Sequence, residues 1–196
     1  MRNGMSDNER RKRRRNRRFQ AIVIYVAIAV GLAWFFESQA TTTIIFVRHA
    51  EKSTEPADDP ALNEAGKRRV AELARQLVDA DVVAGVDAIY STPFRRTRET
   101  AQGVADALDL PIHDYSPNDN EAVLATILKE HKGKIILVVG HSNTVPTLIA
   151  DLGASKKVPP IQENEYDNIY VISIPWFGKT KTIRMRYGEP YVAAGE

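Results

Sequence analysis

The sequence predicts an α/β protein, a three-layer α/β/α sandwich with a mainly parallel central sheet. Apolar runs of strand length alternate with segments of helical apolar spacing between residues 41 and 187. One run, 134–139, is apolar at almost every position, which is typical of a strand buried on both faces of a parallel sheet. Strands that alternate with helices indicate crossover connections, and these make neighbouring strands parallel.

The elements follow one another without an internal repeat or a low-complexity linker. Strands are predicted where apolar and β-branched residues cluster: 43–47, 86–90, 134–139, 168–174 and 181–187. Helices are predicted where apolar residues recur every three or four positions: 62–78, 95–108, 121–131 and 144–152. Pro146 fits the first turn of the last helix, where its missing N–H costs little. Residues 111–120 are expected to form a loop.

A basic arm precedes this pattern. Residues 1–18 contain nine of the 27 Lys and Arg residues and two of the 25 Asp and Glu residues, a net charge of +7. The rest of the chain then carries 18 basic and 23 acidic groups, a net charge of −5. An acidic body behind a short basic arm argues against nucleic acid as a partner.

Residues 19–36 form an uncharged apolar segment directly after the arm. As a helix this segment would extend about 27 Å, close to the hydrocarbon thickness of a bilayer. The positive-inside rule then places residues 1–18 in the cytoplasm and residues 41–196 on the extracytoplasmic, periplasmic side. The sequence therefore predicts a single-pass membrane protein with a signal anchor at 19–36 and a catalytic domain at 41–196.

A cleaved secretory signal is the alternative for this segment. Ser38 and Ala40 are small residues at the two positions that a signal peptidase reads, so cleavage would follow Ala40. The apolar run is longer than a typical signal core, which favours an uncleaved anchor. Both interpretations export the domain. An uncleaved anchor ends a few residues before the first strand, which favours substrates at or near the membrane surface.

Three segments of the predicted domain share one design, in which an apolar strand ends in polar residues that can handle phosphate. They read Val-Arg-His-Ala-Glu at 47–51, Ile-Tyr-Ser-Thr-Pro-Phe-Arg-Arg-Thr-Arg-Glu-Thr at 89–100, and Val-Val-Gly-His-Ser-Asn-Thr at 138–144. Open α/β sheets bind ligands at the carboxyl ends of their strands. Two histidines, His49 and His141, and at least two arginines are therefore expected at one edge of the sheet.

These motifs resemble those of the histidine phosphatase superfamily, also called the phosphoglycerate mutase-like family. The Arg-His-Ala-Glu sequence at 48–51 is similar to the family's Arg-His-x-Glu signature. Residues 92–100 resemble its Ser-Pro-x-x-Arg-Ala/Thr-x-Gln/Glu-Thr motif, and 140–141 its second histidine. The segment 59–69 is similar to its first loop and helix. The resemblance covers most of residues 43–152 in the family's order and implies a phosphatase domain.

The resemblance implies that His49 is the nucleophile and forms a phosphohistidine intermediate. A neutral imidazole nitrogen can attack phosphorus when a hydrogen bond to the other nitrogen fixes the tautomer. Arg48 and Arg96 are the expected phosphate-binding groups, since a guanidinium binds two oxygens at once. His141 is expected to donate to the phosphate and stabilise the transition state. Asn143 and the main-chain N–H groups of the following helix would add donors.

The second motif contains an ambiguity, because Arg95, Arg96 and Arg98 lie close together in the sequence. The spacing from Thr92 selects Arg96. The family usually has Ser where Thr92 stands, and Ser91 lies one residue earlier. A one-residue slip towards Arg95 therefore stays open.

The proton donor to the leaving group is the least specific assignment. The resemblance places a glutamate close to Glu121, and Asp119 is the alternative. Ser142, where some relatives have aspartate, follows His141, and this excludes the acid phosphatase and phytase pattern. Glu51 is expected to be structural or to orient a neighbouring group.

The predicted function is phosphomonoester hydrolysis through phospho-His49, without a cofactor. A metal site is disfavoured because Arg48 beside His49 would repel a cation. The expected partners are a phosphorylated small-molecule or envelope substrate and the membrane, through residues 19–36. Two alternatives stay open: a catalytically silent phosphate-binding or envelope interaction domain of the same fold, and a phosphoglycerate mutase-like phosphotransferase. The chain has little room for large substrate-capping insertions, which disfavours the mutase.

Overall fold

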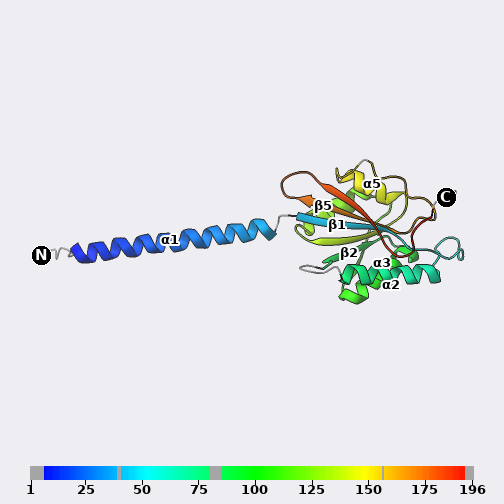
Figure 1. Cartoon of the computed structure of the whole chain (residues 1–196), viewed down its shortest axis with the longest axis horizontal. Coiled ribbons are helices and arrows are strands. Elements are labelled where there is room, and N and C mark those ends of the chain that lie inside the picture. The colour runs from blue at the N-terminus through cyan, green and yellow to red at the C-terminus, as the bar shows by residue number, and fades with distance from the viewer. Residues whose placement is uncertain (1–6, 39–40, 80–84, 156, 193–196) are drawn as a thin grey trace. The chain divides into compact units, whose positions relative to one another are not determined.

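The computed structural model describes residues 7–38, 41–79, 85–155 and 157–192. The chain divides after residue 39 into two compact units. In its described part, the first unit is one helix and the second contains a sheet with helices on both faces (Figure 1).

Helix α1, Asp7–Ser38, runs through the basic arm and the apolar segment without interruption. Within Arg11–Phe36 an 18-residue window has a mean hydropathy of 2.2, so by length and composition the helix can cross a membrane. Large apolar side chains from Phe19 to Phe36 are exposed on it. A helix that is apolar on all sides needs an apolar environment that this unit does not itself supply. Its length and composition therefore meet the requirements of a membrane span.

In the described part of the domain, six strands form one sheet in the order β3-β2-β4-β1-β5-β6 (Figure 1). The strands are β1 Thr41–Arg48, β2 Ala88–Ser91, β3 Ile112–Asp114, β4 Ile135–Gly140, β5 Asn168–Pro175 and β6 Lys181–Arg186. The pairings among β1 to β4 are parallel, and β5 and β6 add two antiparallel pairings at one side of β1. The predicted mainly parallel sheet is confirmed.

Helices cover both faces of this sheet. They are α2 Glu64–Asp79, α3 Arg95–Leu108, α4 Asn120–Glu130 and α5 Thr144–Asp151. In β1, Ile45 and Val47 belong to the core that α2 and α3 cover, whereas Ile44 and Phe46 belong to the core under α4 and α5. Figure 1 shows α2 and α3 on one side of the sheet and α5 on the other. This alternation buries both faces of the strand and confirms the three-layer architecture.

The structure corrects one element. The sequence predicts a loop over 111–120, but Ile112–Asp114 forms β3, which pairs in parallel with β2. The strand is only three residues long, and the two residues that follow Ile112 are polar and exposed. It therefore shows no alternation of apolar and polar residues. The ends of the other elements differ from the predicted ends by at most two residues.

Candidate active site

Three neighbouring strands end at the same edge of the sheet. In the parallel register, Arg48 at the end of β1 lies beside Gly140 at the end of β4, and β2 ends one position earlier. The main-chain N–H of His49 continues this ladder and donates to the carbonyl of Gly140 across 2.9 Å. The residues that directly follow the three strands are therefore His49, Thr92 and His141.

A cavity of about 420 Å³ opens at this edge. It brings together four of the site residues predicted from the sequence, namely His49, Arg96, His141 and Asn143. Asn143 precedes the first turn of α5, and its side chain makes no capping hydrogen bond to the helix. The amide of Asn143 is therefore available to a ligand in the cavity.

His49 is buried, with 4% of its surface exposed, and its tautomer is fixed. Its Nδ1 lies 2.8 Å from the carbonyl oxygen of Ala50, which only accepts, so Nδ1 carries the hydrogen and Nε2 is free. The N–H of Ala50 donates to the hydroxyl of Thr100 in α3, which holds this peptide in place. The pKa of His49 is lowered to about 3, chiefly by burial; the hydrogen bond to Ala50 opposes this shift, and the neighbouring Arg48, His141 and Arg96 contribute to it.

His141 lies beside His49, with 5.5 Å between the ring centroids. Its Nε2 is 3.0 Å from the hydroxyl of Thr92, at the end of β2. Burial lowers the pKa of His141 to about 4, and the positive charges of Arg96 and Arg48 act in the same direction. Both rings are therefore neutral near pH 7.

Of the arginines in the second motif, Arg96 faces the cavity. Its side chain is 16% exposed, its guanidinium lies 4.4 Å from the centroid of the Phe94 ring, and Nη1 is 3.8 Å from Asp59. Arg95 is 55% exposed at its side chain, pairs with Glu99 at 3.4 Å and does not line the cavity. The geometry therefore agrees with the spacing from Thr92 and not with the one-residue slip.

Arg48 lies beside the cavity and is not one of its lining residues. Its Nη1 donates to the carbonyls of residues 162, 163 and 165, at 2.7, 2.7 and 3.1 Å, and the guanidinium stacks on Tyr166 at 4.2 Å. Its Nε is buried without a hydrogen-bond partner. One end of this guanidinium is thus used by the loop before β5, and Nε has no hydrogen-bond partner within the described residues. No sequence motif identified this loop or Tyr166.

The structure does not bring the predicted proton donor to the cavity. Glu121 is exposed in the first turn of α4, and Asp119 caps this helix by accepting from the N–H of Ala122 at 3.0 Å. Neither residue lines the cavity, whereas Asp58, in the loop after β1, does. From the sequence alone, the acidic residues at the start of α4 could not be distinguished from a catalytic acid. The path of the loop after β1 determines that Asp58 is the carboxylate at the cavity.

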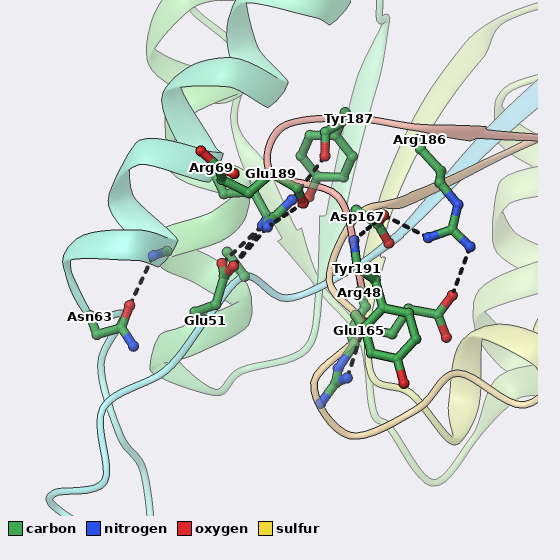
Figure 2. Close-up of polar contacts among 12 residues, drawn as sticks. Arg48, Glu51, Asn63, Arg69, Glu165, Asp167, Arg186, Tyr187, Glu189 and Tyr191 are labelled. Carbon is green, nitrogen blue, oxygen red and sulfur yellow. Dashed lines mark hydrogen bonds and ion pairs between the residues drawn. The ribbon is translucent and has the colours of Figure 1, made fainter. Parts of the chain in front are cut away.

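Glu51 forms an ion pair with Arg69 of α2, with Nη2 and Oε1 2.8 Å apart. Arg69 also donates to the carbonyls of Tyr187 and Glu189 at 2.8 and 3.0 Å, so it fixes the segment after β6 (Figure 2). Figure 2 also shows Asp167 bound to Arg186, 2.6 Å apart, next to the loop that holds Arg48. Glu51 thus has a structural contact of the kind expected from the sequence.

The arrangement defines a class of site. A histidine with a free nitrogen, a second neutral histidine and a guanidinium surround one cavity at the carboxyl edge of a parallel sheet. Guanidinium and imidazole N–H groups are donors suited to phosphate oxygens. Among the described residues, no three His, Asp or Glu side chains converge as metal ligands would. The domain is thus an α/β protein with a histidine site whose donor groups suit phosphate.

Comparison with known proteins finds a family match within the domain. Residues 44–116, which contain the first two motifs, match the sequence model of the histidine phosphatase superfamily, branch 1. Phosphoserine phosphatase 1 of Hydrogenobacter thermophilus is 37% identical over 75 residues, which are 35% of this chain and 34% of that protein. The match therefore spans about a third of the length of this curated relative.

Solved structures share the fold over more of the chain. The structure of the protein histidine phosphatase SixA complexed with tungstate is 21% identical, with a TM-score of 0.60 over 74% of this chain and 96% of that one. A mutant phosphoserine phosphatase from Entamoeba histolytica, in complex with phosphoserine, is 18% identical, with a TM-score of 0.52 over 69% and 95%. At these identities the likeness shows the fold.

Proposed function

We propose that the domain is a phosphomonoester hydrolase that works through a phosphohistidine on His49. The observation that carries the proposal is the 2.8 Å hydrogen bond from Nδ1 of His49 to the carbonyl of Ala50. It leaves Nε2 with its lone pair, and a pKa of about 3 keeps that nitrogen unprotonated at neutral pH. A nucleophile in the required tautomer is thus held at a cavity with a guanidinium.

In the first step, Nε2 of His49 bonds to phosphorus while the bond from phosphorus to the leaving oxygen breaks. Arg96, His141 and Nε of Arg48 stabilise the charge on the other phosphate oxygens. The leaving oxygen takes a proton from a carboxylic acid, and Asp58 is our candidate because it lines the cavity. In the second step, water bonds to phosphorus, the P–N bond breaks, a water proton returns to the carboxylate and phosphate leaves.

The relatives' names support the phosphatase chemistry. One structural neighbour is named a protein histidine phosphatase, and a curated relative and another neighbour are named phosphoserine phosphatases. All three names describe the removal of a phosphoryl group, and this reaction is the only property of these proteins that we propose for the present domain. A phosphorylated small molecule or envelope component is the substrate class that we propose.

We propose also that α1 anchors the protein. Residues 1–18 would lie in the cytoplasm as a basic arm, 19–36 would span the membrane, and 41–196 would be the extracytoplasmic domain, because positive residues stay on the cytoplasmic side. N-terminal sequencing of the membrane-extracted protein tests the anchor. A sequence that starts at Thr41 would show cleavage after Ala40 instead.

The catalytic proposal is tested with the full chain in detergent, in the presence of EDTA. We expect phosphate release from an aryl phosphate, and His49→Ala should abolish it. His113→Ala is the matched control, because His113 is exposed on β3 and does not line the cavity. Brief incubation with labelled substrate should leave an acid-labile, alkali-stable phosphoryl group on the wild type only. Tungstate binding without turnover would favour a silent phosphate-binding domain and overturn the proposal.

A further inference from the structure

The turn between β5 and β6 exposes two adjacent aromatic residues. Trp176 is 73% exposed and Phe177 is 89% exposed. Single exposed apolar residues are common on soluble proteins and need no explanation. Two adjacent, exposed, large aromatic residues in a hairpin turn are less common and suggest an interaction. Lys179 and Lys181 follow them and are exposed. Protein segments that lie at membrane–water interfaces are typically rich in aromatic residues and lysine.

This tip lies at the end of the sheet where β1 begins. Pro175, the last residue of β5, pairs with Thr41, the first residue of β1. Figure 1 shows the turn between β5 and β6 at this end of the sheet. Helix α1 ends at Ser38, so only residues 39 and 40 separate it from Thr41. A chain of this length spans at most about 11 Å. A membrane-spanning α1 would therefore hold this end of the sheet close to the bilayer.

The same end of the sheet carries further positive charge. The N–H of Thr43 donates to the carbonyl of Lys134 at 2.9 Å, which places the turn before β4 beside the start of β1. Lys132 and Lys134 in this turn are exposed. Asp87 lies at this end as well, and its carboxylate accepts from the N–H of Ile135. Four exposed lysines on an otherwise acidic body suit the anionic headgroups of a bilayer.

We infer that the β5–β6 turn, with Trp176 and Phe177 at its tip, inserts into the headgroup region of the membrane that α1 spans, and that it orients the domain there. The inference rests on the proposed anchor and not on the proposed catalysis. The turn and the anchor give the domain two attachments at one end of the sheet. Two attachments restrict the rotation of the domain more than a single attachment does.

This orientation determines where the active site lies. His49 follows the last residue of β1, and a strand of eight residues extends about 25 Å. The cavity is therefore at the end of the sheet opposite the membrane contact. Substrates reach it from the aqueous side, as soluble phosphorylated molecules or as phosphorylated groups on another protein. This revises the expectation that a short tether favours substrates at the membrane surface.

The experiment uses the full chain in vesicles of phosphatidylcholine and phosphatidylglycerol. The chain contains no cysteine, so Thr180→Cys gives a single site for an environment-sensitive fluorophore beside the intact aromatic pair. Thr54→Cys, in the exposed loop after β1, is the matched control at the catalytic end. We expect blue-shifted emission and quenching by lipid-borne nitroxides at residue 180, and water-like emission at residue 54.

The aromatic pair is tested in the same background. Trp176→Ser with Phe177→Ser should reduce the lipid quenching at residue 180 at least twofold. Equal quenching with and without the pair, or equal accessibility at residues 180 and 54, would overturn the inference. A blue shift that depends on the protein-to-lipid ratio and is insensitive to lipid quenchers would indicate a second copy instead and would also overturn it. If an alkaline wash releases all variants from the vesicles, α1 does not span the membrane. This result would overturn both the proposed anchor and the inference that rests on it.

Discussion

The hydroxyl oxygen of Thr92 lies 3.0 Å from Nε2 of His141, and Thr92 is completely buried. Because Nε2 is bound to this hydroxyl, Nδ1 is the ring nitrogen that remains for a phosphate oxygen. If Nδ1 of the neutral ring donates to a phosphate oxygen, Nε2 carries no hydrogen, and the Thr92 hydroxyl is then the donor to Nε2. We therefore assign Thr92 as a positioning residue that fixes the tautomer of His141.

Replacing Thr92 tests this assignment. Thr92→Val keeps the shape and removes the hydroxyl, and we expect kcat to fall about fivefold, since one hydrogen bond contributes about 1 kcal/mol. Thr92→Ser keeps the hydroxyl and should retain most of the activity. Steady-state kinetics with an aryl phosphate measure the rates, and nitrogen NMR of His141 reports the tautomer. Equal kcat values for the two variants would contradict the role.

Arg96 and Arg95 form a matched pair of neighbours. Arg96→Lys should lower kcat/KM by about 10- to 100-fold, because a charge-assisted hydrogen bond contributes about 1.5–3 kcal/mol and lysine cannot bind two oxygens in one plane. Arg95→Lys should stay within about twofold of wild type, since Arg95 is exposed and pairs with Glu99. Inhibition by tungstate gives an independent measure of binding. A larger loss for Arg95→Lys would show that the motif register is wrong by one residue.

Asp58 and Glu121 compete for the role of proton donor. Asp58→Asn should slow hydrolysis of an alkyl phosphate at least tenfold and change an aryl phosphate little, because a poor leaving group needs the proton. Glu121→Gln should slow neither substrate, since Glu121 is exposed and does not line the cavity. The ratio of the two kcat values is the measurement. A leaving-group effect in Glu121→Gln alone would restore the assignment made from the sequence.

The order of the motifs was sufficient to predict which histidines meet. Parallel strands bring their carboxyl ends to one edge whatever the length of the connecting helices, so His49 and His141 had to converge once the strands were recognised. The spacing of the second motif from Thr92 favoured Arg96 but left a slip to Arg95 open, and the cavity is lined by Arg96 and not by Arg95. The first inference depends on a general property of parallel sheets and the second on motif spacing.

Other features depend on contacts that no local pattern contains. Arg48 donates to carbonyls more than 100 residues away in sequence, in an irregular loop before β5. The carboxylate at the cavity is set by the path of the loop after β1. The edge strand β3 forms because β2 offers it a partner. These three features depend on contacts between segments that are distant in sequence. The periodicity of apolar residues in a single sequence contains no information about such contacts.

Gly66 is required because α2 approaches the main chain of Glu51. A Cβ at residue 66 would lie 2.2 Å from the carbonyl oxygen of Glu51, a rigid main-chain atom. Gly66→Ala is therefore expected to lower the free energy of unfolding by about 1–3 kcal/mol through overpacking. Gly85→Ala is the control, because its new methyl group would have no neighbouring atom within 4 Å, and it should change stability by less than about 0.5 kcal/mol. Urea denaturation in detergent compares them, and equal stabilities would contradict the close approach.

The two buried histidines predict how stability depends on pH. His49 and His141 have pKa values of about 3 and about 4, below the ordinary value of 6.5. Between these values and 6.5, the unfolded chain binds protons that the folded chain excludes, so the free energy of unfolding decreases as the pH falls. From pH 7 to pH 5 the loss should be on the order of 2 kcal/mol for each histidine.

Urea denaturation of the full chain in detergent at pH 7 and pH 5 measures this loss. Carboxylates elsewhere in the protein also titrate, so the informative quantity is the difference from a variant with His49→Asn and His141→Asn. Asparagine has a similar size and does not titrate, and the variant should lose less stability between the two pH values. If wild type and variant lose the same amount, the histidines are protonated in the folded state at pH 5, and the neutral nucleophile assigned to His49 does not persist there.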